Sequence, residues 1–219
     1  MDTDHEKRRA AQAGAELIEP GMSVGLGTGS TVAHLLGEIA RRGVRATFVA
    51  TSPRTARAAH ELGIVVEVDF PFDRLDLAID GADQVAPDGW LVKGGGGALT
   101  REKIVAASAD RFVVIVDSSK MVASLSAPVP LELLEFGVAA TLRHLGVTVL
   151  RDAAASPDGG RLADHFADPA DLADPATLAG RLGAVPGVIA HGLFAPSLVS
   201  EVIVGRDDGV DRVRYGGNP

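Results

Sequence analysis

Polar and apolar residues follow two different spacings along this chain, and the alternation between them predicts its helices and strands. Residues 6–19 carry alanines and other apolar residues at helical spacing, and Pro20 and Gly21 end this segment. From there to about residue 117, short β-branched runs alternate with helical segments. Because parallel strands need crossover connections, this alternation favours a parallel sheet with helices against its faces.

The first part of the chain is therefore expected to contain several strands separated by helices. Residues 22–43 predict a short strand, a glycine turn and a helix that ends near Gly43. Pro53 suits the first turn of the next helix, and Gly63 suits its carboxyl end. The remaining expected elements are strands at 45–52, 64–69, 75–83 and 111–117, and helices at 53–63 and 99–109.

The pattern changes after residue 117. Residues 124–134 contain two prolines and are interpreted as a crossing to another unit. Residues 137–196 then predict helix, strand, strand, helix and strand, which suggests a small α+β unit. Residues 200–215 resemble a hairpin with Asp208-Gly209 as its turn.

We accordingly predict an α/β protein with a Rossmann-like parallel sheet flanked by helices and a smaller α+β, ferredoxin-like second domain. The Rossmann-like catalytic domain is expected to cover residues 1–127, and the small domain residues 128–202. The C-terminal segment, residues 203–219, is expected to return to the catalytic domain.

The composition of the 219-residue chain excludes several kinds of chemistry and partner. It has no cysteine, which rules out disulfides and thiolate catalysis and is compatible with a reducing cytoplasm, where we expect the protein. Its net charge of −8 disfavours nucleic acid or an anionic membrane as main partner, since either needs a basic surface. No apolar run approaches the roughly 18–20 residues of a membrane span, and the charged N-terminus lacks the apolar segment of a secretory signal.

Positive charge is divided unevenly between the two basic residue types. The chain has 17 arginines but only four lysines, at positions 7, 93, 103 and 120. Lysine is a compact, strongly hydrated point charge on a flexible stem, unlike the planar guanidinium of arginine. The four lysines are interpreted either as positions where arginine does not serve or as chance.

The sequence GLGTGST, from Gly25 to Thr31, follows a predicted strand and opens a predicted helix. Backbone N–H groups at such a turn favour an anion, and Ser30 and Thr31 add hydroxyl donors. The spacing fits neither the dinucleotide fingerprint, whose third glycine would stand at Ser30, nor a phosphate loop that ends in Lys-Ser/Thr. A sugar phosphate or another small anion fits better, and the alternative is a tight turn capped by Ser30.

The sequence DGAD places Asp80 and Asp83 after a predicted strand, at the edge where open α/β sheets bind ligands. Two carboxylates three residues apart can act as acid and base or bind hydroxyl groups. The alternatives are a pair of Mg²⁺ ligands and a plain Asp-Gly turn with capping aspartates.

The sequence KGGGGALTRE places four consecutive glycines between Lys93 and Glu102. Glycine lets a backbone approach a ligand closely and point several N–H groups at it. The alternative for Glu102 is a first-turn residue that complements the helix dipole. A last motif, DSSK, ends another predicted strand and places Lys120 either at the same edge or in a solvated turn.

Taken together, these loops predict a pocket for a polyhydroxylated anion with an acid–base pair. The motifs GLGTGST, DGAD, KGGGGALTREK and DSSK, in this order, with PGVIAHGLFA in the second unit, resemble the type A ribose-5-phosphate isomerases over nearly the whole chain. The resemblance implies interconversion of D-ribose 5-phosphate and D-ribulose 5-phosphate in the non-oxidative pentose phosphate pathway. It also implies that the protein needs no metal or organic cofactor and is a homodimer.

The resemblance further implies roles for particular residues. Glu102 would be the proton-transfer base, and Asp80 and Asp83 would contact sugar hydroxyls and assist ring opening. Lys93 would hold the reacting end of the sugar. Gln84 departs from the family, which more commonly has glutamate there, and so removes a charge beside the site. The implied substrate-binding residues are Thr28, Gly29, Ser30, Thr31, Asp80, Gly81, Ala82, Asp83, Lys93, Gly94, Gly95, Gly96, Lys120 and, less specifically, Lys7.

The chemistry of isomerisation gives the glycine run a purpose. Moving a proton between adjacent carbons through an enediol leaves negative charge on the former carbonyl oxygen, which positioned N–H groups and an ammonium stabilise. We hypothesise that Lys93 to Gly97 forms an oxyanion cradle and that the following helix directs Glu102 at the C–H bond.

Two other classes of function stay open at this point. A related enzyme, such as a sugar-phosphate deaminase or a CoA-transferase-like protein with Glu102 as nucleophile, would use a similar pocket. A non-catalytic sugar-phosphate sensor would keep the pocket without turnover. The sequence has no obvious DNA-binding helix or basic arm that would favour the sensor.

Overall fold

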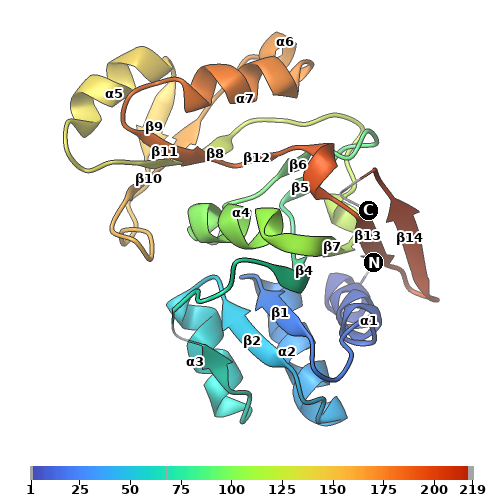
Figure 1. The fold of residues 1–219 in the computed structure, drawn as a ribbon. Helices are drawn as coiled ribbons and strands as arrows, with labels where there is room; N and C mark the ends of the chain where they lie inside the picture. The colour runs from blue at the N-terminus through green and yellow to red at the C-terminus, as the bar shows by residue number, and fades with distance from the viewer. Residues whose placement is uncertain (1, 68, 217–219) are drawn as a thin grey trace. The chain divides into compact units, whose positions relative to one another are not determined.

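In the computed structural model, which describes residues 2–67 and 69–216, the chain divides into two compact units (Figure 1). Unit 1 comprises the described residues of Met1–Ala82, Arg101–Met121 and Pro196–Pro219. Unit 2 comprises Asp83–Thr100 and Val122–Ala195. The sequence predicts a catalytic domain at 1–127, to which residues 203–219 return, and a small domain at 128–202. In the structure, residues 83–100 with the glycine run fall within unit 2.

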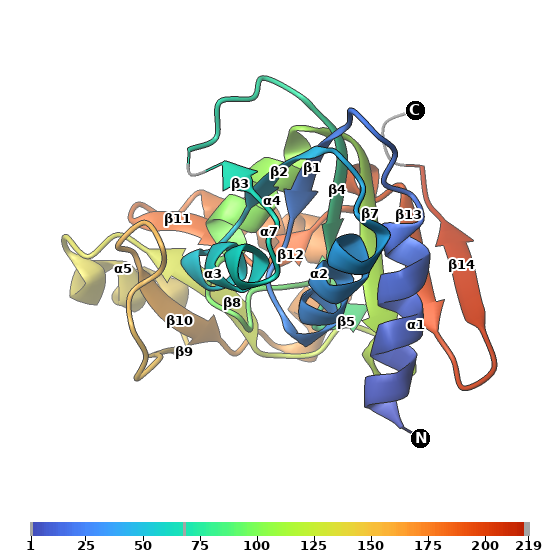
Figure 2. The ribbon, with the colours of Figure 1, turned by 90° about the horizontal axis from the view of Figure 1, so that it is seen from below.

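A seven-stranded sheet forms the centre of unit 1, in the order β14-β13-β7-β4-β1-β2-β3 (Figure 2). Neighbouring strands are parallel, except that β14 pairs antiparallel with β13 at one edge. The predicted parallel sheet is confirmed, and the predicted hairpin supplies its last two strands. The strands are β1 (Ser23–Leu26), β2 (Thr47–Ala50), β3 (Val66–Glu67), β4 (Leu75–Asp80), β7 (Ala109–Asp117), β13 (Glu201–Gly205) and β14 (Val210–Arg214).

Helices α1 (Thr3–Ala15) and α2 (Ser30–Arg42) lie side by side against one face of this sheet (Figure 2). Their buried alanines, leucines and isoleucines join Val24 and Leu26 of β1 in one apolar core. Helix α1 starts three residues earlier than the sequence predicts, because the Asp2 carboxylate accepts the N–H groups of Asp4 and His5. Helix α3 (Pro53–Glu61) follows β2 and begins with Pro53, as predicted.

Helix α4 (Leu99–Ala107) covers the opposite face of the same sheet through its unit 1 residues. Gly25 alternates with Val24 and Leu26 along β1, so it faces away from α1 and α2. A Cβ atom built on Gly25 would lie 2.2 Å from Cγ1 of Val105. This contact sets the distance between α4 and the strands that lead to the candidate site.

Unit 2 contains a four-stranded antiparallel sheet in the order β11-β8-β10-β9. Leu131 and Leu133 belong to an apolar core with residues from its helices, whereas Glu132 alternates to the other face. The predicted sequence of helix, strand, strand, helix and strand is present. The elements are β8 (Val129–Leu133), α5 (Val138–Leu145), β9 (Thr148–Leu150), β10 (Arg161–His165), α6 (Pro169–Leu172), α7 (Pro175–Gly183) and β11 (Val188–His191).

Strand β8 is missing from the sequence prediction, which treats residues 124–134 as a crossing segment because of their two prolines. Pro130 lies within β8 and cannot donate a backbone hydrogen bond, but its carbonyl accepts one from the N–H of Gly192 (2.7 Å). Three further short strands were also not predicted. They form a small sheet of β5 (Gln84–Val85), β6 (Leu91–Val92) and β12 (Leu193–Phe194), and two 3₁₀ turns cover Ser118–Lys120 and Pro196–Leu198.

We expect the substitution Gly25→Ala to lower the free energy of unfolding by about 1–3 kcal/mol, because the β-branched side chain of Val105 cannot turn away from the new methyl group. Urea unfolding measures the change. Gly37→Ala is the matched control, since a Cβ at this position of α2 meets no atom within 4 Å and alanine favours the helix. A Gly25→Ala protein as stable as the parent would contradict the proposed packing of α4.

Candidate active site

Four neighbouring strands of unit 1 end at one edge of its sheet, and predicted motifs follow three of them. The strand order β7-β4-β1-β2 is parallel throughout, so their carboxyl ends share this edge. There β1 leads into Gly27–Thr31, β4 ends at Asp80, and β7 leads into Ser118–Lys120. Ligands of open α/β sheets bind at such an edge, so it is the candidate site of unit 1.

Asp80 organises the loop after β1. Its side chain is 3% exposed, and its Oδ1 atom accepts the N–H groups of Thr28 (3.0 Å) and Gly81 (2.7 Å). The carboxylate lies directly against Gly27, where a Cβ would come within 1.8 Å of Cγ and Oδ1 of Asp80. Asp80 is therefore more than a capping residue of its own turn, because it holds the neighbouring glycine loop.

The loop continues directly into the N-terminus of α2. Gly29 precedes the helix with φ of 148° and ψ of 178°, a conformation that favours glycine. Ser30 is the first helical residue and not the cap, so the alternative of a Ser30-capped turn does not describe this loop. Thr28 and Thr31 are each 8% exposed. The predicted anion-binding residues thus gather at the positive end of a 13-residue helix.

A buried glutamate outside the predicted motifs joins the chain segments that carry Lys7 and Lys120. Oε2 of Glu6, in the first turn of α1, accepts both the N–H (2.8 Å) and the hydroxyl (2.7 Å) of Ser118. Lys7 directly follows Glu6, and Lys120 lies two residues after Ser118. The Glu6 contact therefore brings together, at the carboxyl edge, the chain segments of Lys7 and Lys120, two of the predicted substrate-binding lysines.

Glu102 lies in the first turn of α4 and is 3% exposed. It stands three residues before Val105, so both side chains project from the same face of the helix. Because Val105 contacts β1 at Gly25, this face is directed at the sheet. Helix α4 returns to β7 after a parallel crossover, which puts its first turn, with Glu102, toward the carboxyl edge.

Lys103 follows Glu102 and carries a perturbed ammonium group. Burial lowers the pKa of Lys103 from its ordinary value of 10.5 to about 8. A lysine in this state exchanges its proton close to neutral pH.

In unit 2, Asp83 and the glycine run are joined by a backbone hydrogen bond. The N–H of Gly95 donates to Oδ2 of Asp83 (2.8 Å), and a Cβ on Gly95 would lie 2.9 Å from Oδ1. The N–H of Gly97 donates to the carbonyl of Gly94 (3.1 Å), which closes a turn. Two N–H groups of the run are therefore engaged within the protein, and one of them orients the exposed carboxylate of Asp83.

Lys93 is a buried cation at the end of β6. Its side chain is 3% exposed, and its Nζ atom lies 5.5 Å from the centre of the Phe194 ring. Its backbone N–H donates to the carbonyl of Gly192 (2.8 Å). Gly94 has φ of 109°, which favours glycine and turns the chain sharply after the lysine.

Two further charged residues of unit 2 bind the chain at the glycine run or shortly after it, and neither is part of a predicted motif. Arg151 donates to the carbonyl of Gly94 (2.8 Å) and forms a bidentate pair with Asp164 (2.7 and 2.9 Å). The buried carboxylate of Glu132 accepts the hydroxyl groups of Thr100 and Ser156, both at 2.5 Å. Neither residue stands in a glycine-rich or motif-like sequence, so no local signal marks them.

Gln84 uses both ends of its amide. Its Nε2 atom donates to the carbonyl of Ser126 (2.9 Å), and its Oε1 atom accepts the N–H of the same residue (2.8 Å). A glutamate at this position could accept but not donate. Glutamine at position 84 therefore forms two hydrogen bonds with Ser126 in unit 2, of which a glutamate could form only one.

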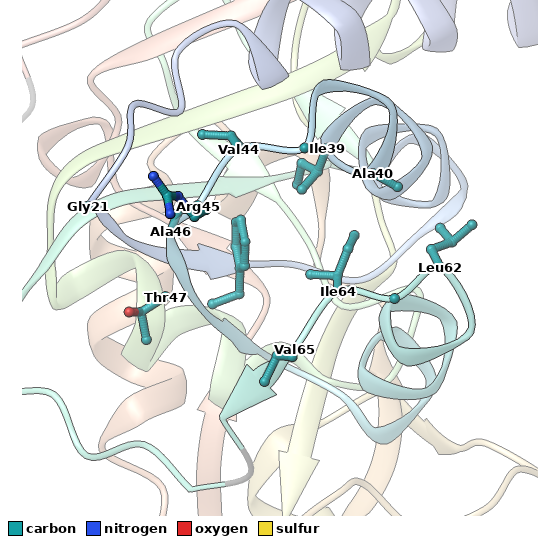
Figure 3. A pocket seen from close by; sticks show the side chains of 13 residues that line it. Gly21, Ile39, Ala40, Val44, Arg45, Ala46, Thr47, Leu62, Ile64 and Val65 are labelled. Atoms are coloured by element: carbon teal, nitrogen blue, oxygen red, sulfur yellow. The ribbon is translucent and has the colours of Figure 1, made fainter.

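Unit 1 also has a hollow of about 540 Å³ at the opposite, amino edge of its sheet (Figure 3). The ends of α2 and α3 line it, with apolar side chains such as Ile39, Val44 and Ile64, and Arg45. Such a lining offers few partners to a polyhydroxylated anion. No predicted site residue is among the described residues around it, so the carboxyl edge remains the candidate site.

Between residues 2 and 216, with the exception of residue 68, no group of three or more His, Asp or Glu side chains is arranged to hold a metal ion. Over the same part of the chain, no helix is long and apolar enough to cross a membrane.

Comparison with known proteins points to a single enzyme family. The family model for ribose 5-phosphate isomerase A (phosphoriboisomerase A) matches residues 47–209. Ribose-5-phosphate isomerase A of Nitrobacter hamburgensis is 44% identical over 211 residues, covering 89% of this chain and 91% of that protein.

Solved structures of similar proteins agree. Ribose 5 phosphate isomerase A from Neisseria gonorrhoeae superposes with a TM-score of 0.91 at 30% identity, covering 97% of each chain. A D-ribose-5-phosphate isomerase in complex with phospho-erythronic acid gives a TM-score of 0.88 at 34% identity, covering 98% of this chain and all of that one.

The buried ammonium of Lys103 should make stability depend on pH. The unfolded chain keeps this proton up to about pH 10.5, whereas the folded protein releases it near pH 8, so the unfolded state binds more protons between these values and stability rises with pH there. We expect Lys103→Met to be more stable than the parent below about pH 8, by on the order of 2 kcal/mol. The difference should shrink toward pH 10.5, as measured by urea unfolding. A difference independent of pH would contradict the assignment.

Proposed function

As the chain belongs to the ribose 5-phosphate isomerase A family and interconverts ribose 5-phosphate and ribulose 5-phosphate, we propose that Glu102 is the general base of this reaction. The observation that carries the proposal is the burial of this carboxylate in the first turn of α4, on the face directed at the sheet. A carboxylate shielded from bulk water can exchange a proton with carbon without losing it to solvent, and carboxylates act as general bases in such transfers.

In the proposed mechanism, one carboxylate serves two adjacent carbons. Glu102 removes the proton from C2 of the open-chain aldose, the electron pair of the C2–H bond forms the C1–C2 double bond, and the carbonyl electrons move to O1. The proton of O2 moves to the O1 oxyanion, which leaves the negative charge of the enediolate on O2. Glu102 then returns its proton to C1 as the O2 electrons form the ketone at C2. General-base help of this kind contributes roughly 10²–10⁴ in rate.

We assign the stabilisation of the enediolate oxygen to Lys93 and the glycine run. Lys93 is buried, and an ammonium in a low-dielectric position stabilises developing negative charge more strongly than one in water. Since the N–H of Gly95 holds Asp83 and that of Gly97 closes a turn, Gly94 and Gly96 are the residues of the run whose N–H groups we propose for the oxyanion. Gly95 contributes by orienting the aspartate.

The two aspartates receive different tasks in this proposal. Asp80 is buried and holds the loop at Thr28, so it suits a fixed contact to a sugar hydroxyl beside the backbone of Gly81 and Ala82. Asp83 is exposed and accepts one backbone N–H, which leaves it accessible to a ligand. We therefore propose Asp83 as the residue that exchanges a proton with the furanose ring during opening.

The phosphate is assigned to the start of α2. Residues 29–31 present backbone N–H groups and the hydroxyls of Ser30 and Thr31 at the positive end of the helix. Lys7 and Lys120, whose segments Glu6 and Ser118 join, supply positive charge on the same edge of unit 1. We propose that phospho-erythronic acid, the ligand of one related isomerase, inhibits this enzyme competitively, because it offers a phosphate and a carboxylate to these two kinds of site.

The remaining expectations concern assembly and location. We propose that the enzyme is a homodimer of the cytoplasm that acts without a metal or organic cofactor. Light scattering of the purified protein measures the assembly directly, and a monomer under conditions of full activity would contradict the dimer.

We expect Glu102→Gln to lower kcat for ribose 5-phosphate by at least about 10²-fold, with little change in KM, because the amide cannot accept the proton from carbon. Conversion to ribulose 5-phosphate in the presence of EDTA measures it. The parent should keep its activity in EDTA. Glu102→Gln keeps the shape of the side chain, so unfolding of parent and variant at similar urea concentrations serves as the control.

Each outcome of that experiment has a distinct meaning. A parent that binds ribose 5-phosphate without converting it would support a sensor over an enzyme. If the Glu102→Gln protein has near-parental turnover, Glu102 is not the general base, although the family assignment stands. A thioester trapped by hydroxylamine after incubation with a CoA substrate would point to the nucleophilic alternative.

We expect Lys93→Met to lower kcat by about 10²–10³-fold, because the loss of one positioned oxyanion donor costs roughly 3–4 kcal/mol in the transition state. Steady-state kinetics with ribose 5-phosphate measures the change. Lys93→Arg is the control for charge, and we expect it to remain impaired, since the larger planar guanidinium does not match the space and geometry of the buried ammonium. Equal activity of the parent and Lys93→Met would show that Lys93 does not stabilise the enediolate oxygen.

A further inference from the structure

Four hydroxyl groups form a buried cluster beneath the loop after β1. They belong to Thr28, Thr51, Ser52 and Thr55, whose exposed fractions are 8%, 1%, 6% and 4%. The Thr28 hydroxyl lies 2.7 Å from that of Ser52, 3.0 Å from that of Thr51 and 3.1 Å from that of Thr55. Ser52 and Thr55 are also 3.0 Å apart. All four residues belong to unit 1.

The position of the cluster follows from the sheet. Strands β1 and β2 are parallel neighbours with Leu26 opposite Ala50, so the residues that follow each strand meet at the carboxyl edge. Ser52 then caps α3 by accepting the N–H of Thr55 (3.1 Å), and this cap turns the Thr55 side chain back toward the loop. The Thr55 hydroxyl reaches the carbonyl of Gly27 at 2.9 Å.

Each hydroxyl has one proton, and the contacts fix where each proton goes. Thr55 donates to the carbonyl of Gly27, so it can only accept from the other hydroxyls. Ser52 accepts the Thr55 N–H and the Thr28 hydroxyl, and its own proton goes to Thr55. Thr51 donates to Thr28. The result is a one-directional chain from Thr51 through Thr28, Ser52 and Thr55 to the backbone of the glycine loop.

We propose that Ser52 and Thr55 are positioning residues for the substrate phosphate, and that the hydroxyl of Thr28 acts inside this chain and not on the phosphate. Both donors of Thr28 are committed to the protein, the N–H to Asp80 and the hydroxyl to Ser52. The phosphate is therefore left to Ser30, Thr31 and the N–H groups at the start of α2. This inference rests on the proposed assignment of the phosphate to that loop.

The loop needs such a restraint because there is space beside it. A hollow of about 300 Å³ borders the loop, and Gly29, Ser30 and Thr55 are among the residues that line it. Asp80 holds the loop from the side of β4, and the hydroxyl chain holds it from the side of β2. Without the bond from Thr55, the carbonyl of Gly27 loses its partner and the loop can relax into the hollow, away from the geometry that binds phosphate.

The test compares two valine substitutions with the same loss of one hydroxyl. Thr55→Val breaks the chain at the glycine loop, whereas Thr51→Val removes only the first donor and leaves the links from Thr28 to Gly27 intact. For Thr55→Val we expect KM for ribose 5-phosphate and the inhibition constant of inorganic phosphate each to rise about tenfold, with kcat within about twofold. Thr51→Val should leave all three near the parental values, and Thr55→Ser, which keeps the hydroxyl, should restore them.

The same measurements can overturn the inference. If Thr55→Val and Thr51→Val lower the unfolding temperature alike and neither changes KM or the phosphate constant, the cluster is structural only. A fall in kcat without a rise in KM would also contradict it. If Thr55→Val does not fold, Thr55→Ala removes the same hydroxyl without a β-branched side chain and should give the same tenfold rise.

Failure of the proposed function has a different signature. A parent protein that turns over ribose 5-phosphate but is not inhibited by inorganic phosphate would remove the phosphate from this loop and overturn the inference, with the isomerase intact. A parent without turnover would overturn the mechanism, yet calorimetric binding of inorganic phosphate to the parent and to Thr55→Val would still test the hydroxyl chain. Equal binding to both proteins would then refute it.

Discussion

The contact between the carboxylate of Asp80 and the backbone of Gly27 is the constraint on which the candidate site of unit 1 depends. The two residues end or follow parallel neighbouring strands, so one side chain can reach across and take the N–H of Thr28. The absence of a Cβ at Gly27 leaves room for it. The loop held in this way starts α2, and its other side is bound by the hydroxyl of Thr55. Three strand ends are thus joined before any ligand arrives, which is what a preorganised anion site requires.

Much of this arrangement can be predicted from the sequence because it depends on local signals. The alternation of β-branched runs and amphipathic segments predicts the parallel sheet, and glycine and proline mark where α2 and α3 end or begin. In such a sheet the motifs after β1, β4 and β7 must share one edge, so their gathering follows from the topology alone. Strand β8 is not predicted from these signals, because prolines are uncommon within strands. It is recognised only from its pairing with β10 and β11 in the structure.

The residues that the sequence does not reveal are those whose partners lie far away along the chain. Glu6 meets Ser118 across 112 positions, and Arg151 meets Gly94 across 57. Each is an ordinary charged residue in its own neighbourhood. What distinguishes them is burial together with satisfied hydrogen bonds, and both properties arise only when distant segments pack. Motifs therefore predict the groups that meet the substrate better than the groups that hold those motifs in place.

The uneven use of lysine and arginine has a physical explanation in the same terms. Lys93 is buried and the other three lysines are half-buried, whereas arginines in ion pairs such as Arg8, Arg41 and Arg74 are largely exposed. A buried guanidinium needs partners for five donors and cannot lose its proton, while an ammonium needs three and can, as the lowered pKa of Lys103 illustrates. Arg151 is the informative exception, with a side chain only 18% exposed. It has a planar partner in Asp164 and a carbonyl in Gly94, which together match its fork, so arginine is retained where that geometry exists and lysine where it does not.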